Sequence, residues 1–327
     1  TINVLSGLAA GEYSIEVYCA VNGTTPSSTI YDNNNNNNYI ASFKVTTAPL
    51  APSNISITPG NTQLSVAFTP GYDGGSAITN YKYSINGGTN FIECSPAQTT
   101  SPIVITGLTN GTSYNVQIRA MNSNGDGVAT SSAAATPSTT PSAPTITGIT
   151  PSCGSLSIAL TPGIDGGSAI TNFKFSINGG TSFAACSPAQ TTGPIVITGL
   201  TNGTSYNVLI KAVNANGDGS ATGSSMATTV LEGTWIGGST GTWETGTNWC
   251  GGMPTASTDV IIPSNVSVEI ASSSLAICNS VTINTGGNLT VNTDQALTVL
   301  GTITNYADIT GLVVKSGGSL KQNSAVL

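Results

Sequence analysis

The residues of this chain that could do chemistry are few, and carboxylates dominate them. Its 327 residues include 14 Asp and Glu, 7 Lys and Arg, and no His. Two Asp pairs recur along the chain, Asp73 with Asp126 and Asp165 with Asp218. Paired carboxylates can hydrolyse glycosides or bind calcium. Because each of these Asp residues precedes a Gly, as in tight turns, turn formation is the favoured interpretation, with weak calcium binding and catalysis as alternatives.

The sequence offers few of the residue combinations that nucleophilic catalysis requires. Without His, a Ser-His-Asp arrangement is impossible. A Ser-Lys arrangement remains open, but Lys82, Lys174 and Lys211 lie in alternating segments that predict solvated strand faces. Cys-x-x-Cys metal spacing does not occur, and no Gly-rich string opens a helix that could bind phosphate. We therefore expect a protein that is not an enzyme and needs no cofactor.

The charge balance narrows the class of partner. Only 6% of the residues are charged, and the formal net charge is −7. A nucleic-acid-binding protein needs a basic surface, and attachment to anionic lipid needs clustered Lys and Arg; we expect neither partner. No apolar run reaches the roughly 18 residues of a membrane-spanning helix.

Two long segments of the chain are near copies. The stretch that begins TPGYDGGSAITNYKYSINGG at Thr69 returns at Thr161 as TPGIDGGSAITNFKFSINGG. Within each copy, apolar residues alternate with polar ones, as in Leu64, Val66 and Phe68, and turn signals such as Asn86-Gly87 recur every eight to twelve residues. Short alternating strands at this spacing predict two tandem β-sandwiches.

The repeated segments resemble the fibronectin type III module. The matching residues are DGGSAITNYKY with its copy DGGSAITNFKF, and GLTNGTSY, which ends at Tyr114 in one copy and at Tyr206 in the other. The resemblance implies that these two tyrosines form structural tyrosine corners, in which the phenol bonds to the backbone of the preceding turn. The Trp usual on the second strand of the family is replaced by Phe68 and Leu160.

The first 49 residues predict the C-terminal part of an incomplete β-sandwich. The string GLAAGEY, ending at Tyr13, is similar to the corner motif but one residue shorter, and strands are expected over residues 14–20 and 41–47. Between them lies a run of six Asn, residues 33–38. A run of this kind favours a low-complexity loop over a defined binding site.

The pattern changes after Thr229. All three Trp of the chain, Trp235, Trp243 and Trp249, fall in the next twenty residues. Short apolar pairs then recur, separated by Gly, Asn and Ser, as in Val281 with Ile283 and Leu289 with Val291. Such a rhythm predicts the start of a parallel β-helix, a solenoid in which each rung stacks on the next.

This segment resembles the Trp-rich opening and β-solenoid of large secreted surface proteins of Bacteroidota, including adhesins exported by the type IX secretion system. The matching residues are GTW at 241–243, Asn248-Trp249-Cys250, Pro254 and VIIP at 260–263. The resemblance implies an extracellular protein on the bacterial cell surface, in attachment or gliding motility. In that context the Trp residues either cap the open end of the solenoid or, as the alternative, stack on sugar rings of a ligand.

An exported protein also permits disulfides. Cys250 and Cys278 both lie in the Trp-rich segment, and we expect them to pair and to brace the first solenoid rung. The other four cysteines are expected to be unpaired: Cys19, Cys94, Cys153 and Cys186.

The sequence therefore predicts an all-β chain of tandem fibronectin type III-like β-sandwiches followed by the start of a parallel β-helix. The expected domains are residues 1–49, 50–137, 141–229 and 230–327. The expected function is a non-catalytic structural or adhesive stalk segment, with weak polyvalent contacts to other surface proteins or extracellular glycans and to secretion-system components. Two alternatives remain: accessory carbohydrate-binding modules of a secreted polysaccharide-degrading enzyme, and a subunit of an extracellular filament.

Overall fold

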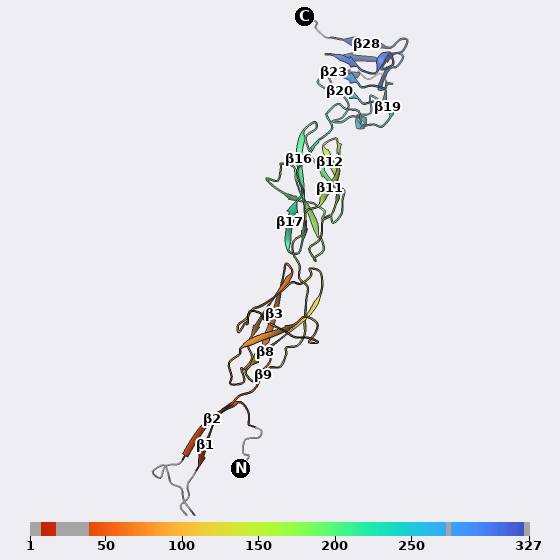
Figure 1. The fold of residues 1–327 in the computed structure, drawn as a ribbon. Coiled ribbons are helices and arrows are strands. Elements are labelled where there is room, and N and C mark those ends of the chain that lie inside the picture. Colours follow the sequence, from red (N-terminus) through yellow and green to blue (C-terminus); the bar gives the residue numbers. More distant parts are fainter. Residues whose placement is uncertain (1–7, 18–38, 273–275, 324–327) are drawn as a thin grey trace, which may run out of the picture. The chain divides into compact units, whose positions relative to one another are not determined.

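A computed structural model describes residues 8–17, 39–272 and 276–323 (Figure 1). Its described part is all-β, with strands β1 to β28 and two single-turn 3-10 helices, η1 (Gly246–Asn248) and η2 (Asp308–Thr310). The predicted fold class is confirmed. The chain divides into two compact units between Thr139 and Thr140, except that residues 166–168 group with the first.

The N-terminal segment forms a two-stranded antiparallel ribbon. Strand β1 (Gly11–Val17) pairs with β2 (Tyr39–Val45), with Tyr13 opposite Phe43. The two rings stack with their centroids 5.7 Å apart, and the Tyr13 hydroxyl donates a hydrogen bond to the carbonyl of Ala9. Both strands begin earlier than their predicted ranges. Cys19 and the Asn run at 33–38 lie outside the described residues.

The first repeat forms a sandwich of two antiparallel sheets. One sheet has the order β3-β4-β7, and the other has the order β10-β8-β5-β6, with β9 also pairing with β8. The strands are β3 (Ser53–Gly60), β4 (Gln63–Thr69), β5 (Asn80–Ser84), β6 (Ile92–Glu93), β7 (Ile103–Thr106), β8 (Tyr114–Asn122), β9 (Gly125–Asp126) and β10 (Ala133–Ala135). The turn predicted at Asn86-Gly87 does join paired strands, because β5 and β6 lie on either side of it.

Alternation along the strands fills the core of this first module. On β4, Leu64, Val66 and Phe68 face inward and are buried, and the Phe68 ring lies 4.7 Å from that of Tyr81 on the opposite sheet. Phe68 thus takes the place of the usual Trp in the same inward position. On β7, Ile103 and Ile105 are each 1% exposed, whereas Val104 between them is 43% exposed. Because successive side chains of a strand point to opposite faces of the sheet, buried and exposed residues alternate along β7.

The second repeat folds in the same way. Its sheets have the orders β11-β12-β15 and β14-β13-β16-β17, with β18 also pairing with β16. The strands are β11 (Thr145–Ser152), β12 (Ser155–Thr161), β13 (Asn172–Ser176), β14 (Ala184–Ala185), β15 (Ile195–Thr198), β16 (Ser205–Asn214), β17 (Gly217–Ala221) and β18 (Ser225–Thr228). Leu156, Ile158, Phe173 and Ile210 are fully buried in this second module.

The C-terminal segment is a parallel β-helix. Its three sheets have the orders β19-β21-β24-β27, β20-β23-β26 and β22-β25-β28, and all their pairings are parallel. The strands are β19 (Thr240–Thr242), β20 (Asp259–Ile262), β21 (Ser267–Ile270), β22 (Ala276–Cys278), β23 (Ser280–Ile283), β24 (Asn288–Val291), β25 (Ala296–Val299), β26 (Ile303–Asn305), β27 (Leu312–Val314) and β28 (Ser319–Gln322).

The rungs of the solenoid stack with their apolar residues in columns. Val260 pairs with Val281, and Val281 with Ile303 on the next rung. In a second column, Val268 pairs with Leu289. Val260, Val281, Val268 and Leu289 are buried in one continuous core with the three Trp, and Ile303 packs against that core while partly buried. A rung buries its apolar side chains only against its neighbours, so stacking is what stabilises each one.

Neighbouring residues on β7 give a matched test of the first module's core. We expect Ile103→Ala to lower the free energy of opening of the module by about 2–5 kcal/mol, because it leaves a cavity between the sheets. Val104→Ala on the same strand is expected to cost less than about 1 kcal/mol. Hydrogen–deuterium exchange of β4 and β7 peptides in the full chain measures both. Equal losses would contradict the assignment of these residues to core and surface.

Candidate functional site

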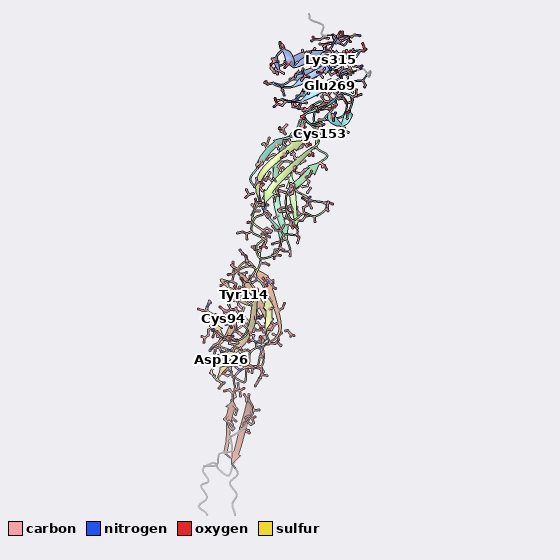
Figure 2. All side chains as sticks on the ribbon, turned by 90° about the vertical axis from the view of Figure 1, so that its right-hand side faces the viewer. Cys94, Tyr114, Asp126, Cys153, Glu269 and Lys315 are labelled. Atoms are coloured by element: carbon pink, nitrogen blue, oxygen red, sulfur yellow. A yellow bond between two sulfur atoms is a disulfide. The ribbon has the colours of Figure 1, made fainter. Side chains whose placement is uncertain are left out.

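The repeated Asp residues serve two structural purposes. The Asp73 carboxylate accepts a hydrogen bond from the backbone N–H of Gly75 at 2.8 Å, which is the turn chemistry expected of it. Asp126, which is labelled in Figure 2, instead forms ion pairs. Its carboxylate lies 2.9 Å from the Lys82 ammonium and 2.6 Å from the Arg119 guanidinium. Its carboxylate is neutralised by two cations, and among the described residues no cluster of His, Cys, Asp and Glu could hold a metal ion.

The ion pairs of Asp126 relieve a repulsion between neighbouring strands. Lys82 on β5 lies directly opposite Arg119 on β8, and like charges in this position are destabilising. Asp126 bridges the two, Glu93 adds a contact to Lys82 at 3.0 Å, and the Arg119 guanidinium lies 4.1 Å from the centre of the Phe91 ring. The Lys82 side chain is 16% exposed, and these partners surround it on the outward face of the sheet.

The second module repeats this charged cluster with one member missing. Lys174 lies opposite Lys211, and Asp218 contacts them at 2.7 and 3.7 Å. The Lys211 ammonium lies 4.0 Å from the Phe183 ring, and Ala185 stands where the first module has Glu93. The hydrogen bond from Lys174 lowers the pKa of Asp218. These Lys and Asp residues form ion pairs on the outward face of the sheet, where the side chains of Lys174 and Lys211 are 32% and 23% exposed.

The same contacts bear on the Ser-Lys arrangement left open by the sequence. Hydrogen bonds to Asp126 and Glu93 raise the pKa of Lys82 above its ordinary value. A lysine that activates a serine must give up its proton near neutral pH, which requires a lowered pKa. Lys82 is thus unsuited to act as a base.

The two tyrosine corners have the geometry that the family resemblance implies. The Tyr114 hydroxyl accepts a hydrogen bond from the backbone N–H of Thr109 at 3.0 Å, and the Tyr206 hydroxyl accepts one from Thr201 at 2.9 Å. In each module this bond closes the turn that leads into the long strand β8 or β16. Both tyrosines are structural.

The three Trp residues form a cap over the first solenoid rung. Trp235, Trp243 and Trp249 are 1–3% exposed, and the Trp249 ring packs edge-on against the other two at 4.9–5.0 Å. The indole N–H of Trp249 donates to the carbonyl of Trp243, and that of Trp235 donates to Gly238. The alternative prediction, ligand stacking by these three residues, is wrong because their ring faces are covered by protein.

Backbone contacts attach this Trp cap to the rung below. β19 pairs with β21, and Thr234 forms a bridge with Ile261. The Glu244 carboxylate accepts hydrogen bonds from the backbone N–H groups of Ala271 and Ser272, both at 3.0 Å. The cap therefore covers the N-terminal end of the solenoid, where it makes both apolar contacts and hydrogen bonds with the first rung.

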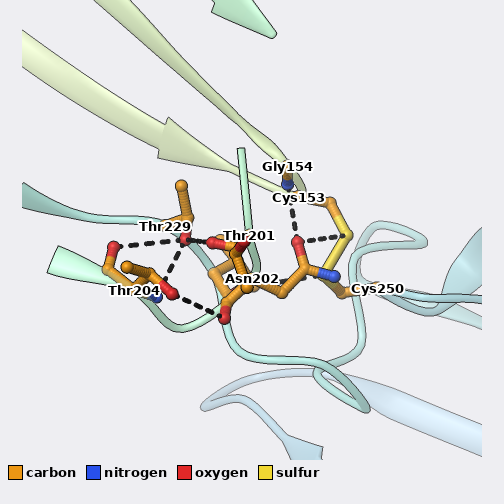
Figure 3. Close-up of a disulfide and its surroundings, with 8 residues drawn as sticks. Cys153, Gly154, Thr201, Asn202, Thr204, Thr229 and Cys250 are labelled. Atoms are coloured by element: carbon orange, nitrogen blue, oxygen red, sulfur yellow. Dashed lines mark hydrogen bonds between the residues drawn. A yellow bond between two sulfur atoms is a disulfide. The ribbon is translucent and has the colours of Figure 1, made fainter. Parts of the chain in front are cut away.

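A disulfide joins the second module to the Trp cap. It links Cys153 to Cys250, with a Cα–Cα distance of 5.4 Å, across 97 positions of the chain (Figure 3). The predicted Cys250–Cys278 pair is wrong, and so is the prediction that Cys153 is unpaired. Cys278 ends β22, and its free thiol is fully buried in the solenoid core. Cys94 and Cys186 are buried and unpaired, as expected.

One signal in the sequence could have identified Cys153. Cys94 and Cys186 occupy the same position in the two repeats, but the equivalent of Cys153 in the first repeat is Asn61. Cys153 lies in the turn between β11 and β12, and it is present only in the module that precedes the Trp cap. A cysteine that breaks an otherwise close repeat is a candidate for a link outside its own module.

Hydrogen bonds support the disulfide on both sides. Asn202 accepts a hydrogen bond from the backbone N–H of Gly154 at 2.7 Å, and Thr229 donates one to the carbonyl of Thr201 (Figure 3). The connecting segment is bonded to the second module through Val230 N–H to the Ser152 carbonyl, and to the cap through Gly233 N–H to the Cys250 carbonyl. We call this region the stapled junction: it comprises the Cys153–Cys250 disulfide and the connecting segment, residues 230–233, with its hydrogen bonds to Ser152 and Cys250.

Comparisons with known proteins match two segments of the chain to protein families. Residues 50–137 match the fibronectin type III domain, and residues 234–327 match a family described as a domain of unknown function (DUF8693). A crystal structure of the FN1–FN3 domains of chicken CNTN1 is similar over 58% of this chain and 71% of that one, with 16% sequence identity and a TM-score of 0.36. No curated protein matches the chain.

The fibronectin type III match indicates a structural or adhesive module. Together with the intramolecular disulfide it is compatible with an extracellular protein, since disulfides persist in oxidising compartments. None of the helices among the described residues is long and apolar enough to cross a membrane.

The stapled junction makes a prediction about stability. Removing the disulfide with Cys153→Ser is expected to lower the free energy of unfolding of the second unit by about 4 kcal/mol, because a loop of this length is released in the unfolded chain. Urea denaturation followed by Trp fluorescence measures it, since all three Trp lie in the cap. Reduced wild-type protein should match the variant. A peptide map of the unreduced protein that showed Cys250 linked to Cys278 would contradict the assignment.

The buried Cys278 thiol gives a pH prediction. Burial, with a smaller contribution from the Asp259 carboxylate, raises its pKa from 9.0 to about 12. The folded state thus favours the neutral thiol, and this stabilisation is complete below pH 9 and is lost as the pH rises toward 12, by up to about 1.4 kcal/mol per pH unit. Cys278→Ala should flatten this decline in Trp-monitored unfolding. Identical slopes for variant and wild type would show that the thiol does not contribute.

Proposed function

We propose that this chain is a structural and adhesive segment of a large secreted bacterial surface protein, in which sandwich modules and a capped solenoid serve as a stalk and contact surface. The observation that carries the proposal is the stapled junction. It joins a fibronectin type III-like module to a parallel β-helix by a covalent bond. Such a bond secures a connection between building units, and it requires an oxidising environment to persist.

The surface of the first module suits weak, repeated contacts. The outward residues of the β3-β4-β7 sheet are uncharged, and most of them carry a hydroxyl group. They include Ser56, Thr58, Gln63, Ser65, Ala67, Thr69, Val104 and Thr106. Hydroxyl groups both donate and accept hydrogen bonds without the desolvation cost of a charge. Extracellular glycans and polar faces of other surface proteins are the partners that such a sheet would contact.

The buried Trp cluster argues against the accessory carbohydrate-binding alternative. That alternative depended on exposed indole rings, and these rings pack against one another and against the first rung. The more specific proposal is an attachment or gliding adhesin of Bacteroidota exported by type IX secretion. It is supported by the resemblance of the Trp-rich segment to the openings of such proteins.

Surface labelling of the native cells tests the proposal. Antibodies raised against residues 50–229 are expected to label intact cells, and protease treatment of intact cells should remove the signal. Alkylation of the thiols before lysis should leave Cys153 and Cys250 unmodified until a reductant is added. An antibody against a cytoplasmic protein serves as the control for cell integrity. Labelling only after lysis would refute an extracellular role, and alkylation of Cys250 without a reductant would show that the disulfide is absent in the native protein.

A further inference from the structure

The stapled junction changes the covalent path through the second unit. Cys153 follows directly after β11, and Cys250 follows the last Trp of the cap. Between the two cysteines lie β12 to β18, β19 and η1, which together make up nearly all of the second module and the Trp cap. The disulfide closes these elements into one covalent loop spanning 97 positions.

We propose that the disulfide is a mechanical bypass, which excludes the Trp cap and all of the second module beyond β11 from any tension applied along the chain. Tension that enters at β11 passes from Cys153 through the sulfur atoms to Cys250 and then into the solenoid strands. Residues 154–249 lie outside that path. The relevance of tension rests on the proposed function, because a surface stalk is pulled from its two ends.

Strand β11 is the only part of the second module that remains in the path of tension, and it can lengthen very little when it is pulled. Its eight residues, Thr145–Ser152, are already extended and pair with β12. A strand rises about 3.4 Å per residue, and a fully stretched chain rises at most about 3.6 Å. Detaching β11 from β12 therefore lengthens the path hardly at all. Force promotes unfolding only when unfolding extends the tethered path, so force has little influence on this module while the disulfide is intact.

The first module has no such protection. Its Cys94 is a buried, unpaired thiol, and the position equivalent to Cys153 is Asn61. Tension enters it at β3 and leaves it after β10, so the whole fold lies in the path. Two modules with nearly the same sequence are thus expected to differ in their response to force, because one cysteine replaces an asparagine.

Pulling on single molecules of the full chain tests the bypass. With handles fused to its two ends, the oxidised protein is expected to show one module-sized extension, from the first module, along with the steps of the N-terminal ribbon and the solenoid. Cys153→Ser should add a second module-sized extension. The additional contour in the variant is at most about 350 Å, the stretched length of the freed loop.

Matched variants separate the bypass from a general effect on folding. Cys186→Ser lies inside the loop, removes a thiol of the same module and leaves the disulfide intact, so it should show the wild-type pattern. Reducing agent added to wild-type protein under force should produce the pattern of Cys153→Ser. A second module-sized extension in the oxidised wild type, or none in Cys153→Ser, would overturn the proposal.

The outcome of this experiment is independent of where the protein resides. Failure of the antibody to label intact cells would refute the proposed function and leave the pulling result unchanged. A second extension in the oxidised chain would refute the bypass while surface labelling could still succeed.

Discussion

Burial of apolar side chains that alternate along short strands is the constraint on which the whole chain depends. With 6% charged residues, the protein has few ionic contacts to use. Four of its seven Lys and Arg, namely Lys82, Arg119, Lys174 and Lys211, face one another across two equivalent strand pairs, and each pair needs an Asp to be tolerable. The Asp carboxylates therefore offset a local repulsion between cationic side chains, and the folding free energy comes from burial of apolar side chains in the cores.

The two sandwiches and their tyrosine corners could be predicted from the sequence because each depends on local patterns. Alternation in Leu64, Val66 and Phe68 assigns the inward face of a strand within a single segment, and a repeat doubles every such signal. The parallel β-helix was predictable for the same reason, because the residues of its apolar columns recur as short apolar pairs at close spacing in the sequence. The ion pairs of Lys82 were missed because they depend on which strands become neighbours, which the pattern of one strand does not specify.

The disulfide was mispredicted for a related reason. Proximity in sequence favoured Cys278 as the partner of Cys250, but the solenoid turns that cysteine into its core, where desolvation keeps the thiol neutral. The actual partner, Cys153, is brought close by the way the last module meets the Trp cap. That placement is set by contacts of the connecting segment, such as Val230 with Ser152 and Gly233 with Cys250, and no periodicity in the sequence encodes them.

The chain places a solenoid directly after a sandwich module. The Trp cap and the disulfide each meet a requirement of that arrangement. A solenoid rung is stable only when both of its edges are covered, so the first rung needs a non-repeating lid, and three Trp rings supply the largest apolar area for it. A lid of this kind is joined to the preceding sandwich by a short connection, and it would be exposed to any pull transmitted along the backbone. Closing the connection with Cys153–Cys250 places the lid and the module inside one loop. The cap that protects the solenoid is thereby itself protected, because the Cys153–Cys250 bond carries the tension past the cap and past most of the second module.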